Sequence, residues 1–451
     1  MLKRLAVVVS SALTLLVVSA GAASAQDSVR RPFRGIFGAP AAPDSPHSLT
    51  FHASVFAAYD DNVIAGLVER QNNRPWLQRR GTYQGANAGL DYAFDVANER
   101  YGFRGHTGVQ GNYYHHGDQS KVLPTYNADV SFDARLTRTV VFAARQSASY
   151  TTNYNSGIVP QLDEDTGHDI GMPLDPSLDI FDLRALRAAS TLSLSSTLWR
   201  YTSVRGAYHY QHVQYTDAGV NNSRFFDYGS HAGSIGINYG RPLTRSATLT
   251  LGYGARVSDR RSRVGEPEVM HQINAGVNYG RALSFSRRTT LSFSTGSAIA
   301  ASERVSVPGS DPRTRIHLIG HLALLHEMGR TWTAGLNYSR GYRTIDGFDG
   351  LYFTDAINAS LNGLFTRRLS FDAAAAWGDS SIENGSGGRH RGTSATARLQ
   401  YALGAYWALY AHGIYHHYRF TDDIVLDPRL PRRVDRAGVR VGVTTSIPLI
   451  R

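Results

Sequence analysis

The chain has 451 residues, with 47 Lys and Arg against 36 Asp and Glu, a formal net charge of +11, and no cysteine. The lack of cysteine excludes a fold held together by disulfides, so stability has to come from backbone hydrogen bonds or a large core. Lysine occurs only at positions 3 and 121, and arginines are spread along the whole chain. Because nucleic-acid binders usually mix lysine and arginine on one patch, this pattern argues against a nucleic-acid partner.

The first residues are typical of an export signal. Two basic residues precede the apolar run 5–18, and small residues lead up to Ala25. The run is shorter than the roughly 20 apolar residues that a membrane anchor needs, so we expect cleavage after Ala25. The next stretch is rich in Pro, Ala, Gly and Arg and has no periodicity. We therefore predict a signal peptide at 1–25, a flexible periplasmic leader at 26–47 and one folded domain at 48–451.

Beyond the leader, apolar and polar residues alternate along most of the chain. In 247–258, Leu249, Leu251 and Tyr253 alternate with threonine and glycine, and this period of two predicts a β-strand. Short basic or polar turns alternate with longer connections, the pattern of an up-and-down sheet. Because the edges of a flat sheet of this length would invite aggregation, we expect the sheet to close into a barrel.

The pattern predicts eighteen strands, at 48–59, 82–96, 101–115, 125–136, 139–151, 185–198, 202–215, 225–239, 247–258, 268–280, 289–300, 313–327, 331–342, 351–365, 369–380, 392–403, 406–419 and 435–449. Aromatic residues form two bands, one beside the short turns and one about ten residues further along, as expected at the two faces of a bilayer. The expected fold is therefore all-β, a transmembrane antiparallel up-and-down β-barrel. Its even strand count places both termini in the periplasm.

One face of the predicted strands carries many arginines. A surplus of positive charge in a narrow lumen raises the local concentration of anions, which favours small anionic solutes. The alternative is that each arginine pairs with an acid on a neighbouring strand and braces the wall. The candidate pore-lining residues are Arg104, Arg145, Arg187, Arg205, Arg256, Arg398 and Arg440.

The longest connection, 152–184, is acidic in an otherwise basic chain, and its first 32 residues, 152–183, contain no Lys or Arg. It follows the fifth predicted strand, and general porins fold a constriction loop into the barrel at this place. By that resemblance of architecture, we expect the loop to face the wall arginines. The alternatives are an outward, solvated loop or a weak calcium site at Asp163, Asp165 and Asp169. The candidate constriction-loop acids are Asp163, Glu164, Asp165, Asp169, Asp175 and Asp179.

The stretch SVFAAYDDNVIAG at 54–66 is a strand followed by Tyr-Asp-Asp-Asn-Val. It resembles the opening strand of a beta-barrel porin family of Gram-negative outer membranes, some members of which are linked to exopolysaccharide systems. The resemblance extends over 49–450 and implies an outer-membrane barrel. Two positions depart from the family pattern: Ile64 stands where an aromatic residue is usual, and the chain ends on Ile450 and Arg451 instead of a terminal aromatic.

These observations predict an outer-membrane channel for the diffusion of small anionic solutes. The alternatives are a barrel that assists export of an acidic exopolysaccharide and a structural or adhesive barrel with a blocked lumen. The sequence has no nucleophile elbow, zinc-binding His pair, phosphate loop or dinucleotide fingerprint, so we predict no enzyme, catalytic residue, metal site or cofactor. Expected partners are outer-membrane lipid and lipopolysaccharide, with small anionic solutes or an acidic polysaccharide in the lumen. A homo-oligomer is compatible with the sequence.

Overall fold

The computed structural model describes a set of segments that covers the predicted strands and most of the short turns. The predicted signal peptide 1–25, the leader up to residue 45 and the acidic loop 152–183 lie outside the described residues. The described segments are 46–61, 81–95, 100–116, 119–151, 184–215, 227–242, 247–260, 268–279, 281–283, 286–301, 315–329, 331–343, 352–382, 388–424 and 432–450.

The described residues form a single sheet of nineteen strands, of which eighteen have 12 to 18 residues and one has three. The strands are β1 (His47–Asp60), β2 (Gly81–Asp95), β3 (Tyr101–His116), β4 (Gln119–Arg135), β5 (Val140–Thr151), β6 (Ala185–Trp199), β7 (Thr202–Tyr215), β8 (Tyr228–Pro242), β9 (Ala247–Arg260), β10 (Glu268–Tyr279), β11 (Arg281–Leu283), β12 (Ser286–Ala301), β13 (Arg315–Met328), β14 (Trp332–Arg343), β15 (Tyr352–Leu364), β16 (Leu369–Ile382), β17 (Arg389–Ala402), β18 (Trp407–Phe420) and β19 (Arg433–Ile450). The part of the chain that the structure describes has no helix long and apolar enough to cross a membrane.

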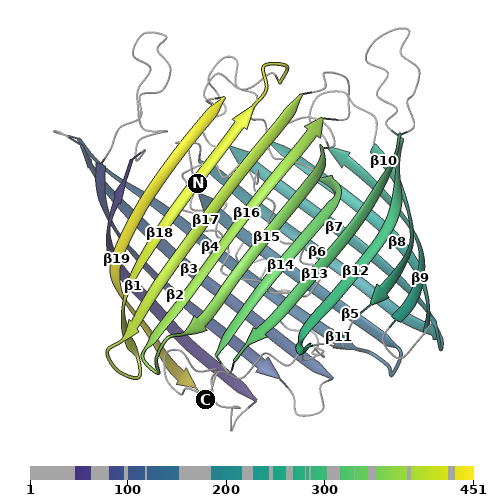
Figure 1. The fold of residues 1–451 in the computed structure, drawn as a ribbon, viewed down its shortest axis with the longest axis horizontal. Coiled ribbons are helices and arrows are strands. Elements are labelled where there is room, and N and C mark those ends of the chain that lie inside the picture. Colours follow the sequence, from purple (N-terminus) through teal and green to yellow (C-terminus); the bar gives the residue numbers. More distant parts are fainter. Residues whose placement is uncertain are drawn as a thin grey trace, which may run out of the picture.

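The sheet closes on itself because the first strand pairs with the last. On one side, Val55 of β1 lies opposite Ala86 of β2, and on the other it lies opposite Val443 of β19. All other strands pair antiparallel with their neighbours in the chain, and the short β11 continues the line of β10 against β12. The result is a barrel of tilted strands (Figure 1). The predicted antiparallel up-and-down barrel is thus confirmed.

Short turns join the strands at one rim of the barrel, and threonine hydroxyls stabilise two of them. The Thr137 hydroxyl accepts hydrogen bonds from the backbone N of Thr139 (3.2 Å) and Val140 (3.1 Å). The Thr366 hydroxyl accepts in the same way from the backbone N of the second and third residues after it, at 3.2 and 3.1 Å. Such side-chain bonds replace part of the strand ladder where the chain reverses. The same rim holds both ends of the sheet, since Leu49 pairs with Ile450.

The fourth strand departs from its predicted start. The sequence pattern places it at 125–136, but β4 begins at Gln119 and includes Pro124, which cannot donate a hydrogen bond to a ladder. Among the described residues, β5 pairs with β4 only from Tyr126 onward, so Pro124 lies where no described ladder partner needs its missing N–H on that side. The connection between β3 and β4 is correspondingly shorter than the predicted loop at 116–124.

The two faces of the barrel wall differ in polarity. Large apolar side chains on the outward face are widely exposed, as for Ile235 (65%), Leu318 (64%) and Val55 (59%). A soluble protein would bury such residues, whereas a membrane barrel presents them to lipid. The intervening residues face the lumen, and they include the candidate site.

Candidate functional site: the inner wall of the barrel

Strand register decides which of the predicted arginines face inward. In β3, for example, Tyr101, Val109 and Tyr113 are exposed on the outward face, so Arg104 lies on the inward face. The same reasoning places five further arginines inward: Arg145, Arg187, Arg205, Arg398 and Arg440. For the seventh, Arg256, the structure describes the backbone pairing with Ser234 and Met270, and its side chain is not described.

Three of these arginines are exposed on the inward face. Arg104 on β3 forms no hydrogen bond or ion pair with the described residues, and its side chain is exposed. Arg205 on β7 is also exposed. The third, Arg145, is 45% exposed, and its Nε donates to Oδ2 of Asp129 on the neighbouring strand at 3.1 Å. Arg145 therefore combines exposure to the lumen with the wall-bracing contact that the sequence offered as the alternative.

A row of polar side chains crosses the inner wall from β1 to β7, and we call it the polar belt. Asp91 lies at its start between two imidazoles, with His52 Nε2 2.7 Å from Oδ2 and His106 Nδ1 2.5 Å from Oδ1. The Asp129–Arg145 pair follows, and Thr191 Oγ1 lies 3.0 Å from His209 Nδ1 at its end. The members of the polar belt are His52, Asp91, His106, Asp129, Arg145, Thr191 and His209.

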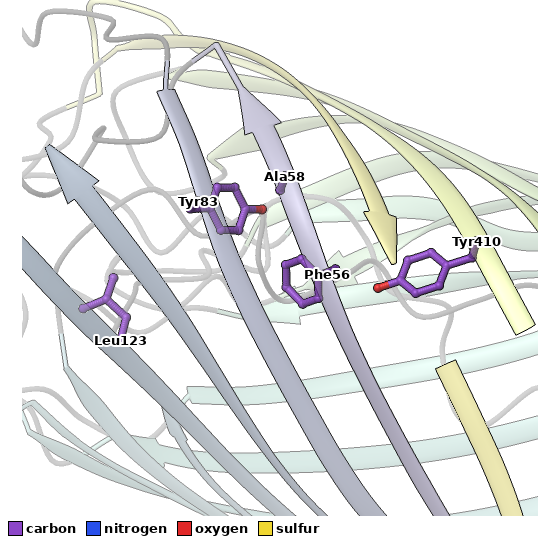
Figure 2. Packing of buried hydrophobic residues seen from close by; sticks show 5 residues of the cluster. All are labelled: Phe56, Ala58, Tyr83, Leu123 and Tyr410. Carbon is purple, nitrogen blue, oxygen red and sulfur yellow. The ribbon is translucent and has the colours of Figure 1, made fainter. Parts of the chain in front are cut away.

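Arg440 also lies on the inward face, but its side chain is only 4% exposed. Its Nε and NH2 donate to the Tyr83 hydroxyl at 3.0 and 2.8 Å, and its guanidinium carbon lies 4.8 Å from the centre of the Phe56 ring. Figure 2 shows Phe56 and Tyr83 side by side, with Tyr410 beyond Phe56. Stacking and hydrogen bonding hold this arginine against the wall, so its role is to join β19, β1 and β2.

Two arginines have partly covered side chains. The guanidinium carbon of Arg398 lies 4.4 Å from the centre of the Tyr410 ring, another cation–π contact. Arg187 donates from NH1 to Thr151 Oγ1 at 3.3 Å. Among the predicted arginines with described side chains, Arg104, Arg145 and Arg205 are therefore the ones best placed to meet a solute.

The two sides of the inner wall differ in how far they are buried. Along β18 the inward side chains are all buried, including His412 (4%), His416 (6%) and Tyr418 (0%). Along β2 to β7 many inward side chains are half-buried or exposed. The accessible part of the inner wall is thus the side that carries the polar belt.

Arg436 also lies on the inward face, is 3% exposed, and was not among the arginines predicted from the sequence. The period-two pattern places Arg436 on the same face as Arg440, so the sequence does contain a signal that it faces inward. The six candidate constriction-loop acids lie outside the described residues. Within the described segments, no three His, Asp or Glu side chains are grouped closely enough to hold a metal ion.

No family model matches the chain, and no curated protein matches it. Among solved structures, it is similar to OccAB4 of Acinetobacter baumannii, with a TM-score of 0.42, 12% identity and coverage of 91% of this chain and 100% of that one. It is also similar to OccK2 (OpdF) of Pseudomonas aeruginosa, solved in complex with glucuronate, with a TM-score of 0.43 and 10% identity over 90% of this chain and 98% of that one. For OpdQ of Pseudomonas aeruginosa, the TM-score is 0.39 and the identity 12%, over 89% of this chain and 98% of that one. TM-scores of this size indicate only a loose structural similarity.

Proposed function

We propose that the chain is an outer-membrane channel for the passive diffusion of small solutes. The observation that carries this proposal is a closed barrel that is apolar outside and has a partly exposed polar belt and exposed arginines inside. Barrels of about 16 to 18 strands are wide enough for an aqueous channel. Closure also pairs the backbone N–H and C=O groups of the first strand with those of the last, as a membrane-spanning sheet requires.

We further propose that the channel prefers anions. Along β2 to β7, four arginines are exposed on the inward face, against three inward aspartates with described side chains. The arginines are Arg104, Arg135, Arg145 and Arg205, and the aspartates are Asp91, Asp129 and Asp133. Field lines from charges on a low-dielectric wall are focused into the lumen, so the surplus of arginines over aspartates raises the local concentration of anions. Export of an acidic polysaccharide would use the same arginines and is the alternative function.

The test is conductance of the purified full chain in planar bilayers, with reversal potentials measured in a salt gradient. We expect anion preference in the wild type and a weaker preference in Arg104→Gln/Arg205→Gln. Arg241→Gln is the matched control, because Arg241 is exposed on the outward face of β8 and should not affect the lumen. A lack of channel activity would contradict the channel, and cation preference in the wild type would contradict the anion preference. Translocation of alginate chains across the bilayer would favour the export alternative.

A further inference from the structure

Three arginines lie side by side on the outward face of β17, β18 and β19. In strand register, Arg391 lies opposite Arg419, and Arg419 lies opposite Arg433. All three side chains are exposed. A fourth exposed arginine, Arg389, lies at the beginning of β17. We call Arg389, Arg391, Arg419 and Arg433 the arginine row.

Two aspartates neutralise only part of this charge. Arg389 donates from Nε and NH2 to the two oxygens of Asp379, both at 2.7 Å, and Arg391 NH2 adds a contact of 3.1 Å to the same carboxylate. At the other end, Arg433 Nε donates to Asp435 Oδ2 at 2.8 Å. In the middle, Arg419 makes no hydrogen bond or ion pair with the described residues. The row thus has four arginines against two aspartates.

The middle of the row is electrostatically unfavourable as it stands. Residues directly opposite each other on antiparallel strands have Cα atoms about 4.5 to 5.5 Å apart, and like charges in such pairs destabilise a sheet. Arg419 has an arginine on both sides. An anion with several acceptor oxygens between these guanidiniums would turn the repulsion into charge-assisted hydrogen bonds, and phosphate is suited to this geometry.

The height of the row along the barrel indicates where this anion comes from. On β18 the outward face carries Trp407, Leu409 and Tyr415, each 42 to 51% exposed, and Arg419 follows Tyr415 by four residues. At about 3.3 Å per residue, the guanidinium row begins about 13 Å along the strand beyond the tyrosine. Aromatic residues mark the edge of the lipid belt, so the row lies at the level of lipid headgroups. The long connections lie at this rim, which makes the leaflet the outer one if both termini are in the periplasm, as the sequence predicts.

An apolar hollow of about 620 Å³ lies on the same side of the barrel, below the row along β19. Its lining includes four side chains exposed on the outward face: Tyr59, Tyr113, Val439 and Val441. Val439 follows Arg433 by six residues on the same strand and face. One molecule with phosphates at its head and acyl chains below could therefore contact both features.

We propose that the arginine row binds the phosphate groups of an outer-leaflet glycolipid, whose acyl chains lie against the hollow next to β19. This inference rests on the outer-membrane location in the proposed function and on the orientation predicted from the sequence, with both termini in the periplasm. It does not depend on solute transport. The chemistry that recognises the lipid is the unneutralised guanidinium of Arg419 between Arg391 and Arg433.

The test measures binding of bisphosphorylated lipid A, dephosphorylated lipid A and inorganic phosphate to the full-length barrel in detergent. We expect Arg391→Gln/Arg419→Gln/Arg433→Gln to weaken binding of bisphosphorylated lipid A at least tenfold. The charge-matched control Arg241→Gln/Arg367→Gln/Arg368→Gln removes exposed arginines at the short-turn rim and should bind as the wild type does. Equal binding of the dephosphorylated lipid by the wild type, or unchanged binding by the first triple variant, would overturn the proposal.

The single variant Arg419→Gln keeps the test valid should the triple variant fold poorly. It removes a side chain without a partner among the described residues, so the lipid-free barrel should be at least as heat-stable as the wild type. Bisphosphorylated lipid A should raise the melting temperature of the wild type and have a much smaller effect on Arg419→Gln. An equal rise in both would refute the site. Conductance measured on the same samples tests the channel separately, since the row faces away from the lumen.

Discussion

The Arg436 guanidinium and the Asp60 carboxylate form a buried ion pair across the seam where the last strand meets the first. Arg436 NH2 and Nε lie 2.6 and 2.7 Å from Asp60 Oδ2, and the side chains are 4% and 6% exposed. The two residues are 376 positions apart in the chain. This contact therefore stabilises the closure of the barrel, and removing one partner would leave a buried charge without its counterion.

We expect Asp60→Asn and Arg436→Met each to destabilise the folded barrel by about 3 to 5 kcal/mol, the range for breaking one side of a buried pair. Reversible urea unfolding in phospholipid vesicles measures this change. Arg432→Met is the control, because its 3.7 Å contact with Asp422 is exposed and should contribute less than about 1 kcal/mol. An equal decrease in the free energy of unfolding for all three variants would show that the seam pair stabilises the barrel no more than an exposed contact does.

Close packing at the seam also depends on Gly442. A Cβ at this position would lie 2.4 Å from the Val55 carbonyl oxygen, 2.8 Å from Phe56 Cβ and 2.9 Å from Tyr410 Cε1. The backbone oxygen cannot move without disturbing the β1–β19 pairing. We therefore expect Gly442→Ala to lower the melting temperature of the barrel and to impair its closure.

Gly413→Ala is the matched control for this substitution, since its Cβ would lie 3.9 Å from its nearest neighbour, the Ala397 carbonyl oxygen. Heat-modifiable mobility in gel electrophoresis compares the two variants at a series of temperatures. A Gly442→Ala barrel as stable as Gly413→Ala would show that the seam tolerates the extra carbon by shifting.

The polar belt should influence the ion selectivity of the channel. Asp91 carries a negative charge on the inward face between His52 and His106. Asp91→Asn removes this charge while an amide oxygen can still accept a hydrogen bond from one imidazole. We expect a stronger anion preference in reversal-potential measurements, with little change in single-channel conductance.

The control for Asp91→Asn is Asp355→Asn. Asp355 lies on the outward face, where its Oδ1 is 3.7 Å from Arg340 NH1 and accepts a hydrogen bond from the Tyr338 hydroxyl. Loss of its charge should leave ion selectivity unchanged, because the wall separates it from the lumen. A shift of equal size in both variants would indicate a general charge effect instead of a role for the polar belt.

The sequence predicts the faces of this barrel better than its contacts. Alternation places Arg104 and Arg205 inward because a strand turns every second side chain to the same side, whatever its partner. The pairing of Asp60 with Arg436 depends on register between strands far apart in the chain, which alternation does not encode. The predicted start of β4 was wrong because alternation alone did not show that the strand continues through Pro124 to Gln119.

The arginine row was not predicted from the sequence. Arg391, Arg419 and Arg433 are separated by 28 and 14 residues, and each one alone is an ordinary arginine near a strand end. Their shared level appears only once β17, β18 and β19 are aligned in register. Charge spacing within one segment therefore could not reveal a site that three strands build together.

The acidic connection 152–183 lies outside the described residues, and its expected place opposite the wall arginines is a proposal from the sequence. Two variants distinguish the steric effect of this connection from the effect of its negative charge. Deletion of 163–179 should raise single-channel conductance and strengthen anion preference, because it removes both an obstruction and negative charge from the lumen. Neutralising the six acids with Asn and Gln keeps the loop length, so it should strengthen anion preference with a smaller change in conductance. Planar-bilayer recordings measure both quantities, and an outward loop would leave both nearly unchanged in the two variants.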